Sequence, residues 1–102
     1  MKEAKSCTNI HEIRHEIDRI DRMVVELIAK RQEYVNEIIR FKTDKASIVA
    51  ESRQDQVYRQ RRAWAEELNL SADMIEEVYK TMIHHNIKKE LELFSQSKIS
   101  IT

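Results

Sequence analysis

The feature that most limits the fold of this chain is an uninterrupted helical seam of apolar residues near its N-terminus. Apolar positions recur at steps of three and four from Ile10 to Phe41, and the sequence contains neither glycine nor proline. A spacing sustained over more than four heptads is typical of one long helix. The seam positions are Ile10, Ile13, Ile17, Ile20, Val24, Leu27, Arg31, Tyr34, Ile38 and Phe41.

The length of this helix predicts that the chain needs a partner. At about 1.5 Å per residue the helix spans roughly 48 Å, whereas a compact chain of about 100 residues has a radius of gyration near 13 Å. The rest of the 102 residues cannot cover such a seam. We therefore predict a homodimer in which a second copy of the helix packs about a two-fold axis. A plain antiparallel coiled coil accounts for the same seam.

Two arginines set this seam apart from an ordinary apolar one. Arg31 occupies a seam position, and a guanidinium is rarely buried unless it is paired. Arg14 lies directly beside the seam, seventeen residues earlier, which is about 25 Å along the helix. That distance is too long for one small ligand within one chain. If two helices cross antiparallel near Arg22, Arg14 of one chain approaches Arg31 of the other, and the dimer has two equivalent sites.

Composition excludes several classes of protein. Charged residues make up 35% of the chain and balance to zero net charge, which argues against nucleic-acid binding. No apolar run is long enough for a membrane span, and the N-terminus lacks the apolar core of a signal peptide. The single cysteine, Cys7, cannot form an internal disulfide, so we expect a cytoplasmic protein. The predicted fold class is all-α, with three helices per chain.

The predicted organisation is a flexible arm over residues 1–8, one helical domain over 9–95 and a frayed tail over 96–102. Thr8 or Asn9 is the expected N-cap of the first helix, which runs to about Phe41 or Lys42. Residues 43–47 are predicted to connect it to a second helix, from about 49 or 50 to 68. That helix should stop at Asn69 in the left-handed conformation, and Ser71 should cap a third helix that frays from Ser95.

Lys42, Asn86 and Glu90 are further candidates for a site. Lys42 follows Arg31 by eleven residues, about three turns or 16 Å, so two long cationic side chains on one face can hold one anion. The plainer interpretation of Lys42 is a lysine that complements a helix dipole. Asn86 and Glu90 share one stripe of the third helix, where polar residues more often form a solvated flank. The adjacent His84 and His85 do not have the spacing of a metal site.

This set of side chains suits a small dianion and a reaction driven by positioning and electrostatic stabilisation. The sequence has no nucleophile paired with a base and no glycine-rich phosphate loop. Intramolecular rearrangements and eliminations are reactions of this kind, because the substrate supplies its own reacting groups.

Three stretches resemble a known family. They are CTNIHEIRHEIDRID over residues 7–21, RFKTDKASI over 40–48 and RAWAEELNL over 62–70. These stretches resemble the all-helical chorismate mutases and, within them, the isochorismate pyruvate lyases of salicylate and siderophore pathways. The resemblance implies an intertwined homodimer of three-helix chains, with two active sites and no cofactor.

The resemblance also implies roles for individual residues. Arg14 from the partner chain and Arg31 bind the carboxylates of isochorismate or chorismate, and Lys42 supports the negative charge that develops at the ether oxygen. The lyase reaction releases pyruvate and leaves salicylate, while the mutase reaction converts chorismate to prephenate. We expect a lyase with residual mutase activity; a dedicated mutase and a non-catalytic dimerisation module are the alternatives.

The sequence departs from the family pattern at two places. Typical mutases have an arginine and then a glutamate early in the second helix, where this chain has Gln54 and Asp55. The loss of that arginine weakens the mutase hypothesis, although Asp55 still suits a substrate hydroxyl. Glu90 stands where the lyases and many mutases have a glutamine, and a carboxyl group can donate a hydrogen bond only when it is protonated.

Overall fold

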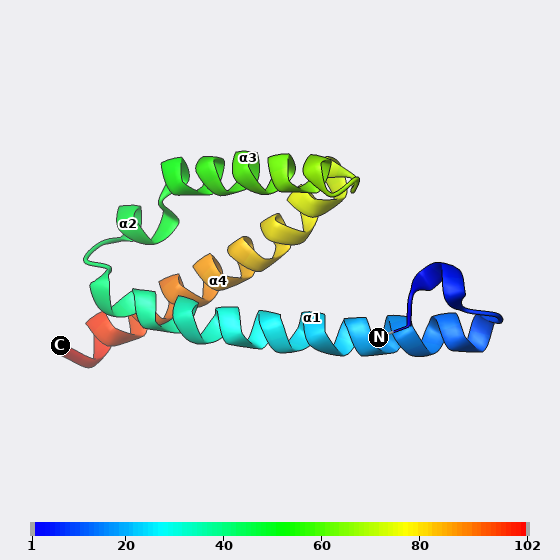
Figure 1. Ribbon diagram of the computed structural model, residues 1–102. Coiled ribbons are helices and arrows are strands. Elements are labelled where there is room, and N and C mark those ends of the chain that lie inside the picture. The colour runs from blue at the N-terminus through cyan, green and yellow to red at the C-terminus, as the bar shows by residue number, and fades with distance from the viewer. Residues whose placement is uncertain (1, 102) are drawn as a thin grey trace. The chain divides into compact units, whose positions relative to one another are not determined.

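The computed structural model describes the backbone of residues 2–101 and the side chains of residues 2–96. All the regular elements in this part of the chain are helical, which confirms the predicted all-α class. Two compact units form, Met1–Ile38 and Ile39–Thr102, and each is described by itself. The elements in Figure 1 are η1 (Ala4–Ser6), α1 (Ile10–Ile38), η2 (Ile39–Phe41), α2 (Lys45–Val49), α3 (Glu51–Glu67) and α4 (Ala72–Ile101).

The first unit begins with a cap that joins the N-terminal arm to α1. Asn9 Oδ1 accepts a hydrogen bond from the Glu12 backbone N–H at 3.0 Å, which confirms an N-cap at Asn9. The Glu12 carboxylate accepts from the Thr8 backbone N–H at 2.8 Å and from Lys2 Nζ at 2.9 Å. These two bonds, the first above all, lower the pKa of Glu12. The arm therefore contains the short turn η1 and is fastened to the helix, while its flexibility stays a prediction.

Helix α1 carries the predicted seam along its whole length, but none of its residues is buried. Ile13 is 44% exposed, Ile17 48% and Ile20 42%. The α-helix ends at Ile38 and is followed directly by the 3₁₀ turn η2, which ends at Phe41. The helical segment therefore ends where it was predicted to end, but its last turn is a 3₁₀ turn. A long apolar seam with no fully buried residue is the main feature of this unit.

The second unit contains a helix that the sequence did not predict. Residues 43–47 were expected to be a plain connection, yet Lys45–Val49 forms α2. Asp44 caps it, since its carboxylate accepts from the Ser47 backbone N–H at 2.7 Å while Ser47 Oγ accepts from the Asp44 N–H at 3.3 Å. These contacts lower the pKa of Asp44. Ala50, in the left-handed conformation at φ 44°, then separates α2 from α3.

Helices α3 and α4 form an antiparallel hairpin whose turn follows the prediction (Figure 1). Asn69 adopts the left-handed conformation at φ 59°, and the Leu70 N–H donates to the Ala65 carbonyl at 2.8 Å. Ser71 Oγ accepts from the Met74 N–H at 3.2 Å, so Ser71 caps α4 as expected. The two predictions for this turn, at Asn69 and Ser71, are confirmed.

The core of the second unit is small and lies where α2 and α3 meet α4. Its buried apolar residues among those described are Ile48, Val57 and Ala65. The Arg61 guanidinium ties α3 to α4, since it lies 4.6 Å from the Trp64 ring and 5.3 Å from the Tyr79 ring.

Helix α4 runs from Ala72 to Ile101, and the fraying expected from Ser95 stays a prediction. The absence of glycine and proline leaves nothing in the sequence that would break the helix there. Within the described residues, no helix has the length and apolar character needed to cross a membrane.

Candidate active site

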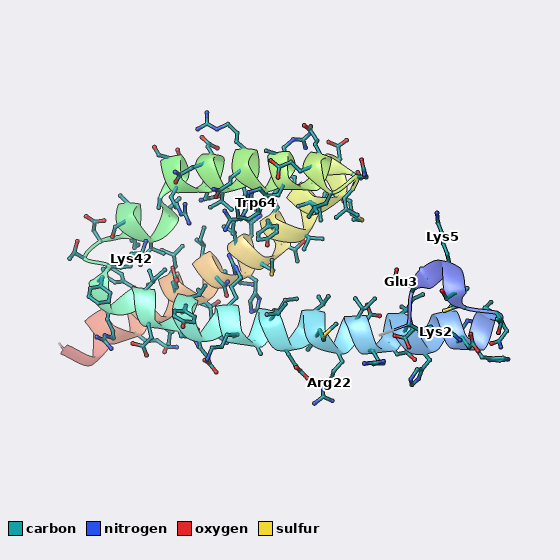
Figure 2. The ribbon with its side chains drawn as sticks, in the orientation of Figure 1. Lys2, Glu3, Lys5, Arg22, Lys42 and Trp64 are labelled. Atoms are coloured by element: carbon teal, nitrogen blue, oxygen red, sulfur yellow. The ribbon has the colours of Figure 1, made fainter. Side chains whose placement is uncertain are left out.

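Lys42 is held by the backbone of α2. It follows η2 directly, and its Nζ donates a hydrogen bond to the carbonyl oxygen of Ser47. Figure 2 shows the Lys42 side chain beside α2. The side chain is also half-buried. The hydrogen bond to Ser47 therefore directs the ammonium group in a partly desolvated environment. A cation placed in this way is suited to stabilising an anion in the same unit.

Glu90 lies on α4 within the electrostatic reach of Lys42. Its carboxyl group is half-buried, and this burial raises its pKa, while the positive charge of Lys42 opposes the rise. The net shift favours the protonated form, which has an O–H donor. Lys42 and Glu90 thus place a cation and a carboxyl group near each other.

Asn86 precedes Glu90 by one helical turn and is the buried polar residue among those described. It is only 7% exposed, and its Oδ1 atom has no hydrogen-bond partner within the described part of the chain. An unsatisfied buried amide oxygen is costly, so such atoms in folded proteins normally have a donor. The hydroxyl group of a bound ligand is a donor of the right kind for this oxygen.

Gln54 and Asp55 differ in their surroundings. Gln54 is half-buried; its Nε2 donates to the Val49 carbonyl at 2.7 Å, and its Oε1 accepts from the Tyr58 hydroxyl at 3.4 Å. Asp55 is exposed at the edge of an open depression of about 440 Å³, lined also by Tyr58, Arg59, Glu76 and Lys80. Tyr58 was not among the predicted site residues, although its i,i+4 spacing from Gln54 places the two side chains on one face of the helix.

Arg14 and Arg31 belong to the other unit. Both lie on α1, Arg14 exposed and Arg31 half-buried. Because α1 is one continuous helix, the two guanidinium groups of a single chain are separated by about 25 Å of helix, as their spacing predicted. The structure therefore places Lys42, Asn86 and Glu90 in one unit and the two arginines in the other.

Comparison with known proteins defines the class to which this fold and these residues belong. The model of the family described as "Chorismate mutase type II" matches residues 13–91. The chain belongs to this family, and the resemblance predicted from its sequence is confirmed.

Two curated relatives show which proteins of this family the chain is similar to. An isochorismate pyruvate lyase from Pseudomonas aeruginosa is 35% identical over 98 residues, which cover 96% of this chain and 97% of that protein. The T-protein of Haemophilus influenzae is 33% identical over 82 residues, which are 79% of this chain but only 22% of that protein. The similarity to the lyase therefore extends along both chains, whereas the T-protein matches through a small part of its length.

Proposed function

We propose that this chain is an isochorismate pyruvate lyase that retains some chorismate mutase activity. The observation that carries the proposal is the 35% identity to a lyase of that name along nearly the full length of both proteins. The presence of Lys42, Asn86 and Glu90 in one unit supports the proposal, since they offer a cation, a hydrogen-bond acceptor and a carboxyl group for such a reaction. The reaction transfers a hydrogen within isochorismate, breaks the ether bond and leaves salicylate and pyruvate, without a cofactor.

In this proposal each candidate residue has one role. Lys42 stabilises the negative charge that develops on the ether oxygen, and protonated Glu90 donates a hydrogen bond to the same oxygen. Asn86 accepts a hydrogen bond from the substrate hydroxyl through its buried Oδ1. Arg31 and the Arg14 of a second chain bind the two carboxylates of the substrate, because arginine forms strong charge-assisted hydrogen bonds with carboxylates. Gln54 and Asp55 remain predicted substrate contacts.

The proposal includes a homodimer with shared sites. The partly exposed seam of α1 supports it, because none of the 29 residues of this helix is buried and much of its apolar face stays accessible to water. A second α1 packed antiparallel on the seam would remove that face from water, at a gain of about 25 cal/mol for each Å² buried. The same arrangement brings Arg14 of one chain towards Arg31 of the other.

A dedicated chorismate mutase is the second candidate function. The family match favours a mutase, since the family that matches residues 13–91 is described as "Chorismate mutase type II". Gln54 argues against it, because the mutases carry a cationic arginine at this position and a glutamine amide has no charge to offer a carboxylate. A non-catalytic dimerisation module is the third alternative.

Product analysis distinguishes these functions. Purified protein is incubated separately with isochorismate and with chorismate, and salicylate, pyruvate and prephenate are followed. The lyase proposal requires salicylate and pyruvate from isochorismate in equal amounts and at a higher kcat/KM than for prephenate formation. Prephenate as the dominant product indicates a mutase. No product from either substrate, and no binding of a cyclic dicarboxylate, indicates a module.

A further inference from the structure

The structure joins Gln54 to Lys42 through the short helix α2. Lys42 Nζ donates to the Ser47 carbonyl, and Gln54 Nε2 donates to the carbonyl of Val49, two residues further along the same helix. The side chains on the two sides of α2 thus bind the backbone of one five-residue helix.

Such a short helix depends on contacts at its ends. Five residues form too few internal hydrogen bonds to be stable alone, and the last four carbonyls of any helix lack partners within it. In α2 three of these four carbonyls accept hydrogen bonds: Ala46 O from the Ala50 N–H at 2.9 Å, Ser47 O from Lys42 and Val49 O from Gln54. At the other end Asp44 and Ser47 form the capping box. Gln54 is therefore the side-chain cap of the C-terminal end.

Tyr58 fixes the direction of the Gln54 amide. The Tyr58 hydroxyl donates to Gln54 Oε1 at 3.4 Å, which leaves Nε2 directed at Val49. The Tyr58 ring in turn lies 5.6 Å from Lys80 Nζ of α4. A hydrogen-bonded path thus runs from α3 through Gln54 to the helix that holds Lys42.

We propose that Gln54 is a positioning residue for Lys42: by capping the C-terminal end of α2 it fixes the Ser47 carbonyl that directs the Lys42 ammonium. This inference rests on the proposed role of Lys42 in catalysis. It gives Gln54 a role different from that of the arginine found there in mutases, because both polar ends of the Gln54 side chain already have partners in the protein. Loss of the cap lets the end of α2 fray and the ammonium lose its fixed direction.

A double-mutant cycle in the full chain separates this role from direct substrate binding. Because one hydrogen bond is worth a modest amount in a folded protein, Gln54→Ala should lower kcat by about three- to tenfold and leave KM nearly unchanged. In a Lys42→Ala background the same substitution should cause no further loss, since the group that it positions is gone. Gln56→Ala, an exposed glutamine two residues further along α3, is the matched control and should behave as wild type.

An equal loss from Gln54→Ala in both backgrounds, or a rise in KM as its main effect, would overturn the proposal in favour of direct substrate contact. Amide hydrogen exchange provides a readout that does not depend on turnover. The amides of Ile48 and Ala50, which bond to the Asp44 and Ala46 carbonyls, should exchange faster in Gln54→Ala than in Gln56→Ala. Unchanged exchange contradicts the capping role. A wild-type protein inactive on both substrates overturns the proposed function, whereas exchange still tests the cap.

Discussion

The two units of this chain use similar apolar content in different ways. Helix α1 has an apolar seam over 29 residues and buries none of them, whereas the second unit buries Ile48, Val57 and Ala65 around its helical hairpin. The difference arises because α3 and α4 are joined by a tight turn and cover each other, and α2 closes onto α4. A single long helix has no neighbour of that kind within its own unit.

One chain brings some residues of the candidate site together and leaves others apart. The second unit fixes Lys42 on the α2 backbone, brings it within electrostatic reach of Glu90 and buries Asn86. The α1 unit carries Arg14 and Arg31 on a helix that keeps them apart. In the proposed dimer, the positions of Lys42, Asn86 and Glu90 depend on the fold of one chain, while the pairing of the arginines depends on the assembly of two.

Removal of either arginine should have the largest effect. Each loses one partner of a desolvated charge pair, which costs roughly 2–5 kcal/mol, or about 30- to 5,000-fold in kcat/KM. Steady-state kinetics on Arg14→Ala and Arg31→Ala measure this loss. Lys30→Ala is the control, because Lys30 is an exposed cation beside Arg31 and pairs on the surface with Glu33. If Lys30→Ala loses as much as Arg31→Ala, the effect is general electrostatics and not recognition.

Lys42→Ala should have the second-largest effect on activity, and it changes only a residue of the second unit. Loss of one preorganised electrostatic donor should lower kcat by about 10²-fold, with a smaller change in KM. Lys45→Ala, which removes an exposed lysine at the start of α2, should leave the rate nearly unchanged. A Lys42→Ala protein within a few-fold of wild type removes this residue from the proposed mechanism.

Glu90→Gln should have the smallest effect near neutral pH and a clear one in the pH profile. Burial raises the pKa of Glu90, so its proton persists to higher pH than that of an exposed glutamate and is then lost. We expect wild-type kcat to fall as pH rises, while the amide of Glu90→Gln still donates and keeps its rate. Glu92→Gln, at an exposed position, should follow the wild-type profile. Parallel profiles for wild type and Glu90→Gln rule out Glu90 as the titrating donor.

The same shift has a consequence for stability. A carboxyl group whose pKa is higher in the folded state than in the unfolded state stabilises the fold only while it is protonated. The free energy of unfolding should therefore fall as pH rises through the folded pKa of Glu90. Urea denaturation at several pH values should show less of this fall in Glu90→Gln.

Much of the fold could be predicted because its signals are local. The caps at Asn9 and Ser71 and the left-handed Asn69 each depend on a few neighbouring residues, and all three are confirmed. Helix α2 could not be predicted from periodicity, since residues 43–47 lack a repeating apolar position. Its capping box between Asp44 and Ser47 and its contact with Gln54 are local, whereas the burial of Ile48 depends on packing against α4, which is a tertiary effect.

The candidate site was predictable in part for the same reason. Asn86 and Glu90 share a helical stripe, so their common face follows from spacing alone. The contact of Lys42 with Ser47 needed α2, which the sequence did not reveal, and the burial of Asn86 needed the packing of the hairpin. The pairing of Arg14 with Arg31 across two chains stays a prediction.

Mixed dimers test most directly whether Arg14 of one chain and Arg31 of the other form one site. Arg14→Ala and Arg31→Ala homodimers should both be nearly inactive, because every site lacks one cation. A heterodimer of the two has one site with both arginines and one with neither. With random pairing half of the dimers are mixed, so co-expressed chains should recover about a quarter of wild-type activity. A sample that contains verified heterodimers and recovers no activity would contradict the shared site.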